Sequence, residues 1–300
     1  MVSSLRTGIM AGFVAIGLVG CGAAAGESSD DTSMDSDEVS KGGGGPTGGG
    51  PGGSTSSKRV LALGDSIAFG MNPLINPPGN PASYKGYPEA IGAIKGVTLD
   101  NASCPGETSG SLLDATKPDN GCRAWKAAYS LHADYETTQI AFAESYIKAH
   151  KDTKFVSIDI GANDLLLLQK SCAGDPTCIQ AGLPGVLGAY GTNLGTTYAR
   201  LRAAGFTGKF VALTVYAMNY NDALSVGALT ALNNVTSQVT IANSGAVADG
   251  FGEFKRLAGA SGDSCAAGLL IKNPDGTCDI HPSPTGRDKL AAIVAAAAVP

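Results

Sequence analysis

The feature that most constrains the fold is a short apolar segment that ends abruptly in Gly64, Asp65 and Ser66. The segment, residues 59–63, is dense enough in apolar side chains to predict a buried strand. α/β proteins place their chemistry at the carboxyl ends of such strands. Gly64 allows a sharp turn there, so we expect Ser66 to lie exposed at the strand end. A serine is a weak nucleophile unless a base and an oxyanion site assist it.

Three further positions supply candidates for those roles. Asn163 comes just after an apolar run at 155–160, and Gly106 comes just after another at 97–102. His281 stands in a proline-rich segment that we expect to be a loop before a C-terminal helix. An imidazole suits the role of base because its unperturbed pKa is close to neutrality.

The other two histidines carry no such signal. His132 precedes a predicted helix, and His150 lies near the end of that helix. A histidine at a helix C-terminus is favourable simply because of the helix dipole. His281 is therefore the expected base.

Strand and helix patterns alternate along residues 58–300, which predicts a mostly parallel sheet covered on both faces. The sequence contains no internal repeat. We expect residues 104–129 to be rich in loops, and 165–168 to lead into a loop between Cys172 and Cys178. The expected strands are 59–64, 97–102, 154–160, 208–216 and 246–251; the expected helices are 87–95, 135–150, 189–204, 223–243 and 283–299.

Ser66, Gly106, Asn163 and His281, in this order, resemble the motifs of the SGNH hydrolases, also called the GDSL esterase/lipase family. The resemblance covers about residues 58–300. It implies a three-layer α/β/α sandwich with an SGNH/flavodoxin-like, mostly parallel sheet of about five strands. It implies Ser66 as nucleophile and His281 as general base. The implied oxyanion hole is made by the backbone N–H groups of Ser66 and Gly106 and the side-chain amide of Asn163, with no cofactor and no metal.

The acid partner of His281 departs from the family pattern. The family places an aspartate three residues before the histidine, whereas this chain has Cys278 there and Asp279 one residue later. Asp279 is the expected acid. Two alternatives stay open: another carboxylate such as Asp275 serves, or a backbone carbonyl holds the imidazole and leaves a Ser–His dyad.

Residues 1–57 are expected to lie outside the fold. Residues 1–21 have a basic residue, Arg6, followed by an apolar stretch too short to span a bilayer, as in a signal peptide. The segment 18–21 is similar to a bacterial lipobox, which implies cleavage before Cys21 and lipid attachment to it; an ordinary secretory peptide is the alternative. Residues 22–57 are acidic and then glycine-rich, which predicts a disordered tether. We therefore expect an exported protein, lipid-anchored in the bacterial cell envelope, with residues 58–300 as a catalytic domain outside the cytoplasm.

The cysteines agree with export. Setting Cys21 aside leaves six of the seven, and an oxidising compartment favours disulfides. Six cysteines allow 15 pairings, but the family resemblance implies pairing of sequence neighbours. A metal site is disfavoured because the cysteines lack Cys-x-x-Cys spacing and only His281 lies near any of them. The expected pairs are Cys104 with Cys122, Cys172 with Cys178, and Cys265 with Cys278.

The charge balance of the chain limits the classes of partner that it could bind. The chain has 21 basic and 26 acidic residues, of which residues 1–57 hold two and six. The remaining domain is nearly neutral, so nothing favours nucleic acid binding. We expect a monomer whose partners are a small-molecule or lipid ester and, through Cys21, a membrane.

The leading interpretation is a carboxylic ester hydrolase that works through a Ser66 acyl-enzyme. Short-chain esters, lipids and acetylated sugars are all open as substrates. Residues 67–87, with Tyr84 and Tyr87, are expected to help shape the pocket beside Ser66. The alternatives are a non-catalytic surface-binding lipoprotein on the same fold and a carbohydrate O-acetyl esterase.

Overall fold

The structure, a computed structural model, describes residues 58–299. The predicted signal peptide, Cys21 and the whole predicted tether therefore lie outside the described residues. Within 58–299, no helix combines the length and apolar character needed to cross a membrane.

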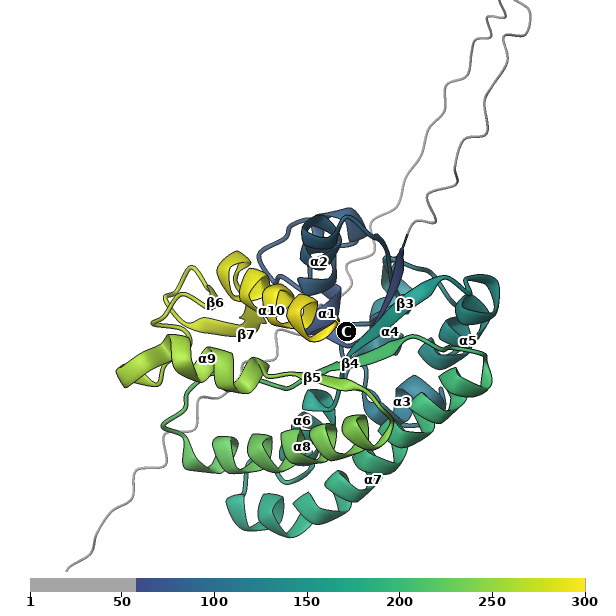
Figure 1. Cartoon of the computed structure of the whole chain (residues 1–300). Coiled ribbons are helices and arrows are strands. Elements are labelled where there is room, and N and C mark those ends of the chain that lie inside the picture. Colours follow the sequence, from purple (N-terminus) through teal and green to yellow (C-terminus); the bar gives the residue numbers. More distant parts are fainter. Residues whose placement is uncertain (1–57, 300) are drawn as a thin grey trace, which may run out of the picture. The chain divides into compact units, whose positions relative to one another are not determined.

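Five parallel strands form one sheet in the order β2-β1-β3-β4-β5 (Figure 1). This confirms the predicted α/β fold with a mostly parallel, five-stranded sheet. Because the chain passes from β1 to β2 on one side and then to β3 on the other, the carboxyl ends of β1 and β3 flank the point where strand order reverses. Open parallel sheets bind ligands at that point. The strands are Arg59–Gly64 (β1), Thr98–Asn101 (β2), Thr153–Asp159 (β3), Lys209–Leu213 (β4) and Ala246–Ala248 (β5).

Helices cover both faces of the sheet, as the family resemblance implies. In Figure 1, α2, α9 and α10 lie on one side of the sheet and α7 and α8 on the other. The helices are Ser66–Phe69 (α1), Tyr87–Lys95 (α2), Ser109–Leu113 (α3), Cys122–Ala128 (α4), Gln139–Ala149 (α5), Ala162–Ser171 (α6), Pro176–Ala203 (α7), Ala223–Ala242 (α8), Gly250–Ala258 (α9) and Pro284–Ala297 (α10).

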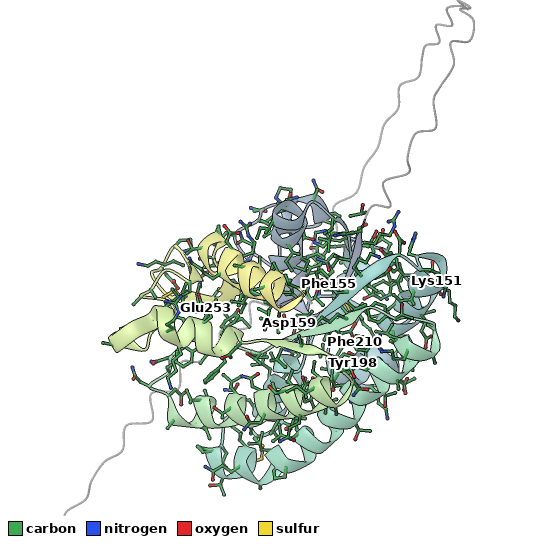
Figure 2. All side chains as sticks on the ribbon, in the orientation of Figure 1. Lys151, Phe155, Asp159, Tyr198, Phe210 and Glu253 are labelled. Atoms are coloured by element: carbon green, nitrogen blue, oxygen red, sulfur yellow. A yellow bond between two sulfur atoms is a disulfide. The ribbon has the colours of Figure 1, made fainter. Side chains whose placement is uncertain are left out.

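Alternate residues of the strands pack into two separate hydrophobic cores, one on each face of the sheet. Phe155 of β3 packs with α2 and α10, whereas its neighbour Val156 packs with α5 and α7. This follows from the two-residue period of a strand, which turns successive side chains to opposite faces. In the second core, Tyr198 of α7 meets Phe210 of β4 with ring centroids 4.3 Å apart (Figure 2).

Capping explains several helix starts. Ser283 caps α10 by accepting a hydrogen bond from Gly286 N, and Pro284 occupies the first turn, as the sequence predicts. Asp175 caps α7 in the same way by accepting from Cys178 N at 2.7 Å. The predicted 172–178 loop and 189–204 helix were therefore wrong in extent, because α7 already begins at Pro176.

Other boundaries also differ from the prediction. The expected fifth strand stops at Ala248, because Asp249 caps α9 by accepting from Gly252 N. Residues 162–171 form a full helix, α6, and the expected loop at 104–129 contains the short helices α3 and α4. Helices α3 and α4, of five and seven residues, are too short to show a helical period, and the four consecutive leucines of α6 do not distinguish a helix from a strand.

The segment around His281 is a strand rather than the predicted loop. Strands β6 (Leu270–Lys272) and β7 (Cys278–Pro282) pair antiparallel in a separate two-stranded sheet. Three disulfides join the cysteines as sequence neighbours: Cys104–Cys122, Cys172–Cys178 and Cys265–Cys278. The last of these ties the start of β7 to the loop before β6.

Candidate active site

The nucleophile candidate begins the short helix α1, directly after β1. Gly64 has a φ of +141°, and a Cβ there would lie 2.2 Å from the carbonyl oxygen of Asp159, so only glycine fits. Asp65 caps α1 through its Oδ1, which accepts from Ile67 N at 3.0 Å. Ser66 is 9% exposed. The turn therefore places Ser66 at the carboxyl edge of the sheet, as expected, but Ser66 is buried there and the expectation that it lies exposed was wrong.

Gly106 lies in a tight turn after β2. Its φ is +82°, and a Cβ would lie 2.5 Å from the backbone oxygen of Asn120. The two residues also share a hydrogen bond, from Asn120 N to Gly106 O, of 2.8 Å. Among the hydrogen bonds of residues 58–299, neither Gly106 N–H nor Ser66 N–H has an acceptor. Both groups are thus available as donors to a substrate oxygen.

Asn163, near the start of α6, is buried and held on three sides. Its Nδ2 donates to Asp65 Oδ2 at 3.1 Å and to the carbonyl of Glu107 at 3.0 Å. Its Oδ1 accepts from Asn120 Nδ2 at 2.9 Å. Asn163 therefore joins the turns that carry Ser66 and Gly106. To stabilise an oxyanion, it has to share one of these amide hydrogens with the substrate.

His281 approaches this group from β7, which packs against α1. Its Nε2 is buried and has no hydrogen-bond partner within the described part of the chain. Its Nδ1 is hydrogen-bonded to Asp279 Oδ1. Among the described residues no hydrogen bond joins Nε2 to Ser66; catalytic hydrogen bonds often form only when substrate binds.

Strand geometry explains how Asp279 reaches His281 from two residues away. Residues i and i+2 of a strand share a face, so the carboxylate of Asp279 lies beside the imidazole. The same carboxylate also accepts from His281 N at 2.9 Å. Burial would raise the pKa of Asp279, but its hydrogen bonds with His281 and the charge of that ring lower it overall. Of the alternatives, Asp275 is exposed and bonded to Thr277.

Several other carboxylates under the site are buried. Burial raises the pKa of Asp65 to about 7, and it likewise raises the pKa of Glu107 to about 7. Burial, together with the charge of Asp65, raises the pKa of Asp159 well above its usual value. Asp159 ends β3 (labelled in Figure 2), and its Oδ2 has no partner among the described residues. Folding therefore favours the protonated form of these groups.

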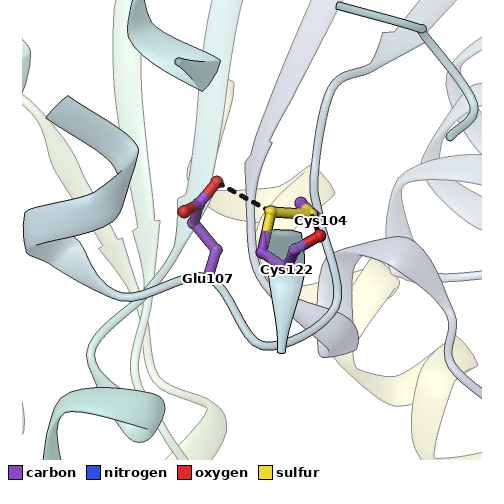
Figure 3. A group of neighbouring side chains, drawn as sticks. All are labelled: Cys104, Glu107 and Cys122. Carbon is purple, nitrogen blue, oxygen red and sulfur yellow. Dashed lines mark hydrogen bonds between the residues drawn. A yellow bond between two sulfur atoms is a disulfide. The ribbon is translucent and has the colours of Figure 1, made fainter. Parts of the chain in front are cut away.

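A cluster of Cys104, Glu107 and Cys122 has the donor types and the spacing of a metal site. The two sulfurs, however, are bonded to each other, as Figure 3 shows, so neither is a thiolate. The contact of 3.5 Å between Cys122 Sγ and Glu107 is drawn dashed in Figure 3, but a disulfide sulfur carries no hydrogen to donate. The donor set does not fit a metal.

The expected pocket residues Tyr84 and Tyr87 are instead core residues, each 1% exposed. Tyr84 packs on Phe69 and Trp125 in a cluster over the Cys104–Cys122 disulfide. Tyr87 lies in the core that α2 shares with α10. The prediction that these two tyrosines help to shape the pocket was therefore wrong.

A serine hydroxyl, an imidazole with one free nitrogen and two unpaired backbone N–H groups are what nucleophilic attack on a carbonyl requires. The model of the GDSL-like lipase/acylhydrolase family matches residues 62–289 of the chain. The chain belongs to this family. Its membership supports an esterase or lipase activity.

Several solved structures share this fold. An extracellular lipase from Streptomyces rimosus is 19% identical, with a TM-score of 0.55, and the match covers 80% of this chain and 100% of that one. A phospholipase A1 from Streptomyces albidoflavus is 18% identical, with a TM-score of 0.53 and coverage of 80% and 99%. A lipase from a goat rumen metagenome is 17% identical, with a TM-score of 0.53 and coverage of 80% and 97%. No protein of curated function matches the chain.

Two buried side chains at the site had no signal in the sequence. Gln139, the first residue of α5, contacts Gly64 from 75 residues away. Glu107 follows Gly106 and turns its carboxyl into the protein. Neither belongs to a recognisable motif, because their partners are brought together only by the fold.

Proposed function

We propose that this protein is a carboxylic ester hydrolase in which Ser66 and His281 carry the chemistry. The observation that supports this most directly is the imidazole of His281: Nδ1 is hydrogen-bonded to Asp279, Nε2 is unpartnered, and the strand packs on the helix that begins with Ser66. This is the arrangement that a general base needs.

In the proposed reaction, Ser66 Oγ bonds to the ester carbonyl carbon while its proton moves to His281 Nε2. The negative charge on the former carbonyl oxygen is met by the N–H groups of Ser66 and Gly106 and by one amide hydrogen of Asn163. The carbon–alcohol bond then breaks, and the imidazolium gives its proton to the departing alcohol. Water, deprotonated by His281, attacks the acyl-enzyme and releases the acid.

Helix α6 supports esters with an apolar group beside the carbonyl. Leu166 and Leu167 follow Asn163 by three and four residues, which puts them on the same helix face, one turn away. Both are half-buried. Leu168 points elsewhere, because its Cδ1 lies 2.5 Å from where a Cβ at Gly182 of α7 would be. If the ester carbonyl lies at Asn163, the apolar group beside that carbonyl would thus contact these two leucines.

The test combines labelling and turnover. An organophosphonate should add once per molecule, on Ser66, as read by intact mass and peptide mapping. Ser66→Ala and His281→Ala should each lower kcat by about 10⁴-fold or more, and the double variant should lose little further, because the two residues act as a unit.

Ser264→Ala is the matched control. Ser264 stands in a second Gly-Asp-Ser triplet, but it is fully buried and donates to Ala217 O at 2.7 Å. The Ser264→Ala variant should still take the label on Ser66 and should have near-normal kcat. Additive losses, or turnover in Ser66→Ala, would show that the mechanism is wrong, and a folded protein that takes no label would favour the non-catalytic alternative.

Acyl preference is read from a panel of nitrophenyl esters from acetate to decanoate, with lysophospholipid and acetylated xylan. We expect kcat/KM to rise with acyl length. Replacing Leu166 and Leu167 together by alanine should reduce the ratio of octanoate to acetate by about tenfold, since each buried methylene contributes about 0.8 kcal/mol. An unchanged ratio of octanoate to acetate would show that α6 does not contact the acyl chain.

A further inference from the structure

Gln139 makes an unusual set of contacts with the backbone of Gly64. It is completely buried, at the first position of α5. Its Oε1 accepts from Gly64 N at 2.6 Å, and its Nε2 donates to Gly64 O at 2.9 Å. One side chain thus satisfies both polar groups of the residue that ends β1, two residues before Ser66.

The same amide also reaches the turn that carries Gly106. Gln139 Nε2 donates to Glu107 Oε2 at 3.2 Å, and Glu107 Oε1 accepts from Ser111 Oγ. Glu107 is 3% exposed. Every hydrogen-bonding group of the Gln139 amide is therefore used, and its partners belong to two different turns.

These two turns carry the two backbone donors that have no acceptor in the described chain, Ser66 N–H and Gly106 N–H. They follow different strands, so their relative position depends on contacts between the turns. Cys104 N, which donates to Gly64 O at 3.1 Å, is one such contact, and Asn163, which donates to Asp65 and to Glu107, is another. Gln139 adds a third, from the first residue of α5.

We propose that Gln139 is a positioning residue, which holds the Ser66 turn and the Gly106 turn in register for attack on the carbonyl. This rests on the proposed ester hydrolysis and goes beyond it, since Gln139 touches no substrate. A glutamine is required because one end of its side chain both donates and accepts. An ionised glutamate in its place can only accept, and it would put a second carboxylate against Glu107.

Two substitutions test the proposal. Gln139→Met keeps the length and removes the hydrogen bonds. It should lower kcat by about 10²-fold, as expected for a misplacement of about 1 Å, while KM changes by no more than about threefold. Gln139→Glu should approach normal kcat near pH 5, where the introduced carboxyl is protonated and can donate. Its kcat should then fall relative to wild type as the pH rises to 8.

Each rate is divided by the concentration of molecules whose Ser66 reacts with the organophosphonate. Thermal melts are recorded at each pH. Gln180→Glu, the same change at an exposed position of α7, is the matched control and should follow wild type throughout. Glu107→Gln in the Gln139→Glu background removes the repulsion, so the fall with pH should be partly relieved.

Folded variants with wild-type kcat and an unchanged pH profile would overturn the proposal. So would failure of both variants to fold at any pH, since Gln139 would then be a folding residue only. Failure of the proposed function looks different: wild type itself would take no label on Ser66, or Ser66→Ala would keep its turnover.

Discussion

Replacing Asp279 by asparagine tests whether the two-residue spacing in β7 produces a working acid–base pair. Asp279 is partly buried and makes two hydrogen bonds to His281, one to Nδ1 and one to the backbone N. An asparagine has the same shape, but it can turn its NH₂ toward Nδ1. The ring proton then sits on Nε2, where it blocks transfer from Ser66.

The expected loss follows from these contacts. A hydrogen bond to a charged partner contributes about 1.5–3 kcal/mol, which corresponds to about 10- to 150-fold in kcat. The wrong tautomer adds to this, and amidation of the aspartate in a Ser-His-Asp triad costs about 10⁴-fold. We therefore expect kcat to fall by about 10²- to 10⁴-fold, with KM little changed because Asp279 does not contact the substrate.

The assay is steady-state hydrolysis of a short-chain nitrophenyl ester, corrected for labelled sites, with a thermal melt to establish folding. Asp275→Asn is the matched control, because within residues 58–299 the Asp275 carboxylate bonds only to Thr277 N and Thr277 Oγ1, at 3.0 and 2.7 Å. It should stay within about twofold of wild type. If Asp279→Asn keeps half its activity, or if Asp275→Asn loses as much, Asp279 is not the acid.

Three further outcomes are expected. Gly106→Ala should lower kcat by about 10²-fold, because the new Cβ meets backbone 2.5 Å away and has to shift the turn; normal kcat would mean that the turn does not position a donor. Stability in urea should fall as the pH rises from about 4 to 7, because the buried acids with raised pKa values hold protons that the unfolded chain has lost. The slope is at most about 1.4 kcal/mol per pH unit for each such group. Asp159→Asn should flatten the profile, whereas a flat or rising wild-type profile would contradict the expectation. Cys21→Ser should release the expressed protein from the membrane fraction or leave its signal peptide uncleaved; unchanged fractionation would exclude the lipid anchor.

Local sequence determined much of this protein. An apolar run followed by Gly64 leaves few choices other than a buried strand and a sharp turn, because a Cβ at that position meets the backbone of the neighbouring strand. Ser283 and Pro284 set the start of α10 for equally local reasons. The alternation of strands and helices was enough to predict the parallel sheet, and with it the edge at which Ser66 and Asn163 lie.

The tertiary structure decided what the local pattern could not. Asp279 shares a face with His281 only because residues 278–282 pair with β6, and a strand of five residues with no clear alternation does not predict its own pairing. Gln139 acquires its contacts because α5 packs with its first residue against the end of β1, 75 residues earlier in the chain. Both depend on long-range packing, which supplies most of the free energy that holds such short elements in place.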